Sequence, residues 1–231
     1  MALQQADVLL YDALVNDELI RNYVQGHCKL VYVGKRKGKK EFSQDEINDL
    51  IVFYASRYKH VVRLKGGDPF IFGRGHEELA YAAKRGIEVE IIPGVSSATA
   101  APSVAGIPQT KRGVNESFWV VTGTLASGDL PEDIYHAARS SATVIILMGM
   151  SKLETIVSIF SDFRGAEEPV AVVRYATWKD QMIVSGTMQH IAGLVRQREI
   201  DAPAVIVVGR VVKESLLLDR LSEIKSQYIQ A

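Results

Sequence analysis

The chain has 231 residues, and its apolar share of 47% and charged share of 23% are ordinary for a globular protein. Lys and Arg together number 27, as do Asp and Glu, so the formal net charge is zero. A neutral chain has no broad positive field for nucleic acid or anionic lipid, so an anionic ligand must be bound by local groups. The single cysteine, Cys28, excludes an internal disulfide and a cysteine-based metal site. With no long apolar run and no signal-peptide pattern, we expect a cytoplasmic protein without a membrane span.

The first half of the chain alternates short apolar runs with longer segments of helical apolar spacing, a pattern typical of a parallel α/β sheet. The predicted strands are residues 6–11, 29–33, 60–65 and 88–92. A helix is predicted over residues 43–58, because Ser43 and Glu46 have the spacing of a capping box and the following apolar residues share one face.

A second α/β series follows, with predicted strands at residues 118–122, 143–148, 170–174 and 204–208. The extended run 181–186 follows strand 170–174 too closely for a crossover helix, so these two should pair antiparallel and make the second sheet mixed. Ser151 and Glu154 repeat the capping-box spacing at the start of a further helix. Turns and a charge cluster at residues 111–115 predict a domain boundary there, with domains 1–112 and 113–231.

In open α/β sheets, ligands gather at the carboxyl ends of strands, so the residues after each predicted strand are the first candidates for a site. Gly66 and Gly67 let the backbone turn sharply beside a ligand, and Asp68 supplies an acceptor for hydroxyls or an amine, which suits a nucleoside or an amino acid. The residues alone leave open a structural alternative, in which Asp68 only caps the next helix.

Ser96 and Ser97 follow strand 88–92 and the Pro93-Gly94 turn, where they can cap a helix or let its first N–H groups meet a polar ligand. Capping alone is the interpretation that this segment favours by itself. Gly73 and Gly75 lack the third glycine and the later acidic residue of a dinucleotide site, so nicotinamide binding is not expected.

Asp12 and Lys35 follow the first two predicted strands, which would place a carboxylate and an ammonium at one sheet edge for proton transfer or for binding substrate charge. A surface salt bridge is the alternative. Arg36, Arg74 and Arg112 follow similar turns and can hold the carboxylates of a poly-acid bidentately, although each arginine by itself is typical of a solvated surface. No metal site is expected at residues 76–78, because adjacent helical residues face different ways.

Taken in order, these segments closely resemble the uroporphyrinogen-III C-methyltransferases of the tetrapyrrole methylase family. The resemblance covers nearly the whole chain, and its most specific motif is the run Gly-Gly-Asp-Pro-Phe-Ile-Phe-Gly-Arg-Gly at residues 66–75. The other segments that carry it are residues 11–12, 33–36, 44–48, 93–96, 106–108, 121–123 and 208–210. It implies two α/β domains with the cofactor in the cleft between them, and a homodimer.

The resemblance implies roles for fourteen residues at matching positions. S-adenosylmethionine is the implied methyl donor, S-adenosylhomocysteine is its product, and the implied cofactor contacts are Gly66, Gly67, Asp68, Ile71, Ser96, Ser97, Met148 and Ala176. Asp12 is the implied proton acceptor and Lys35 the implied proton donor. Arg74 and Glu77 are implied in catalysis, and Arg36 and Arg112 in binding substrate.

The implied reaction is methylation of two pyrrole carbons of uroporphyrinogen III, giving precorrin-2 by way of precorrin-1 for sirohaem or cobalamin. A sulfonium methyl is electrophilic and a porphyrinogen pyrrole is electron-rich, so alignment and proton removal suffice and no metal is expected. Three alternatives stay open. They are methylation of another corrin precursor, methylation of RNA, which the neutral charge disfavours, and non-catalytic binding of tetrapyrrole or cofactor.

Two departures from the family pattern bear on these expectations. Family members begin with a strand and a Gly-Pro-Gly-Asp loop, whereas this chain starts within the following helix, so we expect the first sheet to keep an unpaired edge. Lys39, Lys40 and Glu41 stand where a histidine is common, and His76 replaces a glycine. The first departure is the feature that favours the non-catalytic alternative.

Overall fold

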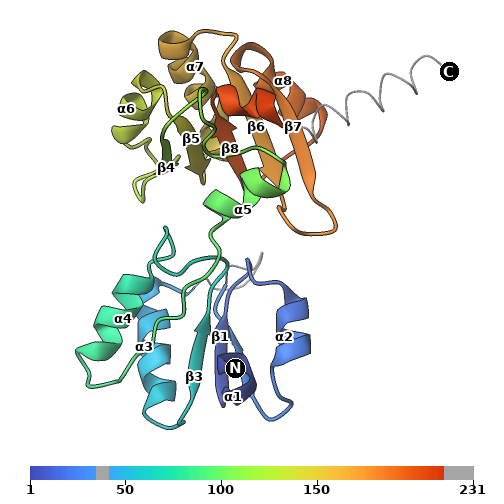
Figure 1. Cartoon of the computed structure of the whole chain (residues 1–231). Helices are drawn as coiled ribbons and strands as arrows, with labels where there is room; N and C mark the ends of the chain where they lie inside the picture. Colours follow the sequence, from blue (N-terminus) through green and yellow to red (C-terminus); the bar gives the residue numbers. More distant parts are fainter. Residues whose placement is uncertain (35–41, 216–231) are drawn as a thin grey trace, which may run out of the picture. The chain divides into compact units, whose positions relative to one another are not determined.

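The computed structural model describes residues 1–34 and 42–215, and the chain divides into two compact units, Met1–Ser96 and Ser97–Ala231 (Figure 1). Each unit is built around its own sheet, as predicted for an α/β protein. In the described residues no helix is long and apolar enough to cross a membrane.

The first unit contains a parallel three-stranded sheet, in which the central strand β1 (Val8–Tyr11) lies between β2 (Lys29–Tyr32) and β3 (Val61–Leu64). The helices of this unit are α1 (Ala2–Gln5), α2 (Asp17–Tyr23), α3 (Gln44–Ala55) and α4 (Gly75–Ala83). The parallel arrangement confirms the prediction, and three of the four predicted strands are present within two residues of their expected ends.

Both faces of β1 are buried, which explains its unbroken apolar sequence. Side chains alternate along a strand, so Leu10 packs with α3 residues on one face, while Leu9 packs with Ile20 of α2 on the other. The capping box at the start of α3 is confirmed: Ser43 accepts the Glu46 N–H, and the Glu46 carboxylate accepts the Ser43 N–H.

The predicted strand at residues 88–92 is wrong, because this segment has no strand conformation. A strand exists only where a neighbour pairs with it, and residues 88–92 have no such partner within the described part of the chain. Val89 and Ile92 are accordingly exposed, in spite of their high strand propensity.

The second unit contains a mixed five-stranded sheet in the order β4-β5-β8-β6-β7. Its strands are β4 (Phe118–Thr122), β5 (Thr143–Leu147), β6 (Pro169–Arg174), β7 (Met182–Thr187) and β8 (Ala204–Val208). β4 and β5 are parallel, β8 is antiparallel to β5 and β6, and β6 pairs antiparallel with β7. The predicted β6–β7 hairpin and the mixed sheet are therefore confirmed.

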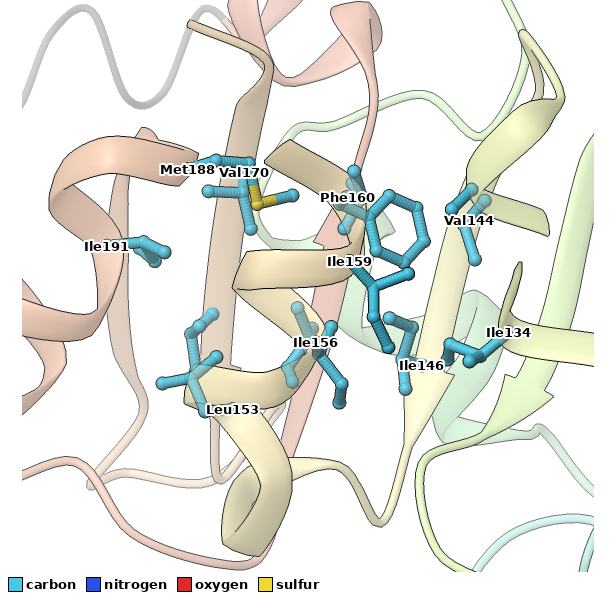
Figure 2. Close-up of a cluster of buried hydrophobic side chains, with 14 of the residues drawn as sticks. Ile134, Val144, Ile146, Leu153, Ile156, Ile159, Phe160, Val170, Met188 and Ile191 are labelled. Carbon is cyan, nitrogen blue, oxygen red and sulfur yellow. The ribbon is translucent and has the colours of Figure 1, made fainter. Parts of the chain in front are cut away.

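Helices cover both faces of the second sheet. The helices of this unit are α5 (Ser97–Val104), α6 (Asp133–Arg139), α7 (Leu153–Arg164) and α8 (Met188–Gln197), with short 3₁₀ turns η1 (Met150–Lys152) and η2 (Arg210–Glu214). Figure 2 shows Phe160 and Ile156 of α7 lying against Ile146 of β5, within the larger apolar cluster. Ala98 and Ala101 of α5 pack on the opposite face.

The predicted capping box at Ser151 and Glu154 is wrong. Residues 150–152 form the 3₁₀ turn η1, so α7 begins one residue later than the pattern indicates, at Leu153. Lys152 occupies the N-cap position and makes no side-chain capping bond, since Ser151 lies inside the preceding turn.

The boundary between the two compact units lies between Ser96 and Ser97 of the chain, whereas the predicted boundary lies between residues 112 and 113. Helix α5 belongs to the second unit because its alanines pack against strands β5 and β8. The assignment of residues 1–112 and 113–231 to two functional domains stays a prediction.

The apolar cluster around α7 predicts a large difference between two phenylalanines on that helix. Phe160 is fully buried, whereas Phe163 is 43% exposed. Phe160→Ala should lower the free energy of unfolding by about 3–5 kcal/mol, since it removes buried area and leaves a cavity. Phe163→Ala is the matched control and should cost less than about 1 kcal/mol. Equal losses in urea denaturation would contradict this account of the core.

Candidate active site

The carboxyl ends of β1, β2 and β3 meet at one edge of the first sheet because all three strands are parallel. Asp12 directly follows β1, and Gly66 follows β3 after one residue. The two segments are in close contact there: a Cβ on Gly66 would lie 2.5 Å from the Cβ of Leu14. A glycine at this position is therefore required by packing between the two strand-end loops.

Asp68 connects two loops at this edge. Its Oδ1 accepts the Phe70 N–H at 2.8 Å, and its Oδ2 accepts the Gly94 N–H at 3.1 Å. The alternative in which Asp68 caps the next helix is wrong, because α4 begins at Gly75 with Arg74 in the N-cap position. Asp68 instead ties the loop after β3 to the turn at residues 93–94.

The approach of these two loops is as close as backbone allows. A Cβ on Gly94 would lie 2.5 Å from the carbonyl oxygen of Gly67, and Gly67 itself has a φ of 97°, which favours glycine. Ile71, further along the same loop, is 41% exposed. Its neighbours Phe70 and Phe72 are exposed as well, so the loop presents three large apolar side chains to solvent.

Helix α5 begins at Ser97, as the predicted capping position requires. Ser96 immediately precedes it and is buried, whereas Ser97 is exposed. Gly94 and Ser96 lie on the same short segment, so the first N–H groups of α5 follow the turn that Asp68 holds. A helix N-terminus of this kind favours a polar or anionic group.

Arg74 is paired with Glu77 through two short hydrogen bonds, at 2.8 and 2.6 Å. These bonds raise the pKa of the Arg74 guanidinium and lower the pKa of the Glu77 carboxyl. Both side chains are more than half exposed, so a substrate carboxylate can reach Arg74 and compete with Glu77 for it.

A group of buried charges lies behind these exposed residues. Glu78 Oε1 is 2.9 Å from Lys65 Nζ and 3.4 Å from Arg63 Nε, and Arg63 Nη2 is 3.1 Å from Asp12 Oδ2. Burial, followed by repulsion from Arg63, lowers the pKa of the Lys65 ammonium. Asp12 is thus paired with the buried cation Arg63. Its predicted relation to Lys35 stays a prediction, because Lys35 lies outside the described residues.

Sequence reasoning missed Arg63 and Glu78. Each had a detectable signal, because Arg63 is a charge inside an apolar strand and a buried charge needs a partner. Glu78 lies three residues after Gly75 and four before Ala82, which are both buried on the same face of α4. Lys35 and Arg36 lie outside the described residues.

The remaining predicted residues belong to the second unit. β5 and β6 are both antiparallel to β8, so they run in the same direction, and Met148 and Ala176 follow their carboxyl ends at the same edge of the sheet. Met148 is exposed, and its carbonyl oxygen accepts the Thr124 hydroxyl at 2.9 Å. Arg112 is exposed in the turn closed by Lys111 and Asn115.

Strained backbone concentrates in these strand-end loops. Left-handed φ values are costly for residues other than glycine, and they persist where the surroundings enforce them, often at functional sites. Among the described residues, all such positions except Glu199 lie in loops that sequence analysis identified or directly beside one: Phe72, Arg74, Met148, Tyr175 and Thr177. The strain therefore supports function at the carboxyl edges of both sheets.

A comparison with known families identifies the chain. The family profile of the Tetrapyrrole (Corrin/Porphyrin) Methylases matches residues 1–192, which include every strand-end loop described above except that after β8. The chain belongs to the tetrapyrrole methylases. Within the described residues, no group of three or more His, Cys, Asp or Glu side chains is arranged to hold a metal ion.

Individual tetrapyrrole methylases give a finer comparison. The chain is 45% identical over 213 residues to uroporphyrinogen-III C-methyltransferase of Methanocaldococcus jannaschii, covering 91% of this chain and 88% of that protein. It is 43% identical over 221 residues to siroheme synthase of Chromobacterium violaceum, covering 95% of this chain but 46% of that longer protein.

The architecture is similar to that of a solved tetrapyrrole methylase. Uroporphyrin-III C-methyltransferase from Thermus thermophilus, complexed with S-adenyl homocysteine, matches with a TM-score of 0.78 at 33% identity. The match covers 92% of this chain and 89% of that one. The predicted α/β class, with one parallel and one mixed sheet, is therefore confirmed at the level of the whole fold.

The close approach of the loops predicts that the edge does not tolerate a methyl group at Gly94. Gly94→Ala should lower the free energy of unfolding of the first unit by about 1–3 kcal/mol, because the Gly67 carbonyl must move. Gly26→Ala is the matched control, since a Cβ there meets nothing within 4 Å. Indistinguishable urea midpoints for the two variants would contradict the packing described here.

Proposed function

We propose that the protein transfers methyl groups from S-adenosylmethionine to two pyrrole carbons of uroporphyrinogen III, giving precorrin-2 by way of precorrin-1. The observation that carries the proposal is the 66–75 loop, which Asp68 ties to the turn before α5 at the carboxyl edge of a parallel sheet. Relatives with the same activity in their names, including one bound to S-adenyl homocysteine, support it.

Several features of the first unit support binding of an adenosyl amino acid. Gly66 and Gly67 carry no side chain, so the backbone N–H and carbonyl groups there can approach the donor. The proposal adds Asp68 and Ile71 of the same loop and the hydroxyl of Ser96. It also adds Ser97, which begins α5 and belongs to the second unit. The donor supplies an electrophilic sulfonium methyl, and the protein supplies its orientation.

The proposal assigns Met148 and Ala176 of the second unit to the same cofactor. Both follow strands at one edge of the mixed sheet, and both lie at or beside positions with left-handed backbone. The cleft between domains, the homodimer and a cytoplasmic location are further parts of the proposal. They follow the resemblance and the single cysteine rather than any contact in the described residues.

The reaction needs one bond exchange and one proton acceptor at each step. A pyrrole carbon attacks the methyl, the carbon–sulfur bond breaks, and S-adenosylhomocysteine leaves with the electron pair of that bond. The methylated macrocycle then loses a proton, and Asp12 is the proposed acceptor of that proton. Lys35 is the proposed proton donor of the site. Arg74, Arg36 and Arg112 are proposed to bind the substrate's carboxylates, with Glu77 setting the position of Arg74.

Turnover with both substrates tests the proposal directly. Incubation under anaerobic conditions should give a tetrapyrrole that gains two methyl groups, which mass spectrometry detects, together with S-adenosylhomocysteine. Labelled methyl from the donor should appear on carbon. Binding of both molecules without any methylated product would overturn the proposal in favour of a non-catalytic binding protein.

The role of Asp68 predicts a binding defect in one variant. Asp68→Ala removes the acceptor of two backbone N–H groups and should weaken binding of S-adenosylhomocysteine by about tenfold or more in calorimetry. Asp7→Ala is the matched control, because Asp7 accepts the His60 N–H just before β1 begins, at the amino edge of the same sheet. The control should bind normally. Equal affinity in the two variants would contradict the proposed site.

A further inference from the structure

Two adjacent glutamates of α4 have opposite surroundings. Glu77 is about half exposed and pairs with Arg74, whereas the side chain of Glu78 is 7% exposed. A carboxylate removed from water is costly unless it is paired and hydrogen-bonded. The burial of the Glu78 carboxylate therefore requires a structural or functional explanation, whereas the exposed Glu77 requires none.

The partners of Glu78 come from three parts of the first unit. Its Oε1 is within 2.9 Å of Lys65 Nζ after β3, 3.2 Å of Gln44 Nε2 in α3, and 3.4 Å of Arg63 Nε in β3. Gln44 is itself bonded to Asn48 Oδ1 on the next turn of α3. One oxygen thus contacts two cations and links helices α3 and α4 to the carboxyl end of β3.

Arg63 connects Glu78 to Asp12, because it contacts both carboxylates. Its Nη1 donates to the Leu64 carbonyl at 2.6 Å, and its Nη2 contacts Asp12 Oδ2 at 3.1 Å. The other oxygen of Asp12 accepts the Leu14 N–H at 3.1 Å. Every nitrogen of the guanidinium is therefore engaged, and both carboxylate oxygens of Asp12 have a defined partner.

The four charges are balanced, with Arg63 and Lys65 against Glu78 and Asp12. The side chains of Arg63 and Lys65 are 13% and 11% exposed, and that of Asp12 is 23% exposed, so solvent screens their interactions weakly. Without the charge of Glu78, two buried cations would share the single carboxylate of Asp12. Lys65 would then be drawn toward Asp12, which would change the position of Asp12 and weaken it as a proton acceptor.

We propose that Glu78 is a positioning residue for Asp12, acting through Arg63 and by holding Lys65 away from it. This inference rests on the proposed function, in which Asp12 accepts a proton from the methylated substrate. Within the described residues, the Glu78 carboxylate bonds to Gln44, Arg63 and Lys65, and none of these belongs to the 66–75 loop that Asp68 holds. Its effect therefore falls on the proton step and leaves binding of the methyl donor unchanged.

Restoring the charge balance is the test that a merely structural role would not pass. Glu78→Gln keeps the shape and an acceptor oxygen but removes the charge, and should lower kcat by about tenfold or more, a part of what a general base contributes. In the double variant Lys65→Met with Glu78→Gln, one cation again faces one carboxylate, and kcat should recover to within about threefold of the parent. Affinity for S-adenosylhomocysteine should stay unchanged in both.

Glu154→Gln is the matched control, since it makes the same substitution at an exposed ion pair with Arg196 and should leave kcat unchanged.

Failure of the double variant to recover, with donor binding intact, would overturn the inference while the proposed function stands. If the parent protein shows no turnover, the proposed function fails, and crystal structures of the variants still decide the inference. In the structure of Glu78→Gln, Lys65 Nζ should bond to Asp12. In the structure of the double variant, Arg63 should keep its contact with Asp12. An unmoved Lys65 would contradict it.

Discussion

The first unit is organised by the need to pair a buried guanidinium. Arg63 points from an otherwise apolar strand into a region that excludes most water, so carboxylates must approach it from both sides. Asp12 does so from the end of β1 and Glu78 from α4, and Gln44 adds α3 through Glu78. One ionic requirement therefore brings the end of the central strand and two helices to the carboxyl end of β3, where the candidate site lies.

Close packing of backbone, rather than ion pairing, fixes the loop after β3. The loop after β3 approaches the turn before α5 so closely that a side chain is excluded at Gly94, and it approaches Leu14 so closely that one is excluded at Gly66. Asp68 joins the loop to the turn by accepting an N–H group from each. Such a loop has little freedom left to lose when a ligand binds, which favours affinity. The candidate site thus combines closely packed backbone with the exposed cation of Arg74.

Local patterns in the sequence predicted what depends on local physics. Strand positions follow from apolar runs, the α3 cap from Ser43 and Glu46, and the β6–β7 hairpin from a connection too short for a helix. The misses depend on distant partners or on geometry finer than spacing. Residues 88–92 have the composition of a strand but no pairing neighbour among the described residues, and a 3₁₀ turn displaced the start of α7 beyond Ser151. The partners of Asp68 and Glu78 lie 26 and up to 34 residues away.

The central claim is that loops at the carboxyl edges of both sheets bind one methyl donor. Amide hydrogen exchange with and without S-adenosylhomocysteine tests it most directly, because it reports each loop separately. We expect slower exchange at residues 66–71, 94–97, 148–149 and 175–177 together, with the amino edge around Asp7 unchanged. Protection confined to other surfaces, or no change at these loops under saturating ligand, would contradict the account.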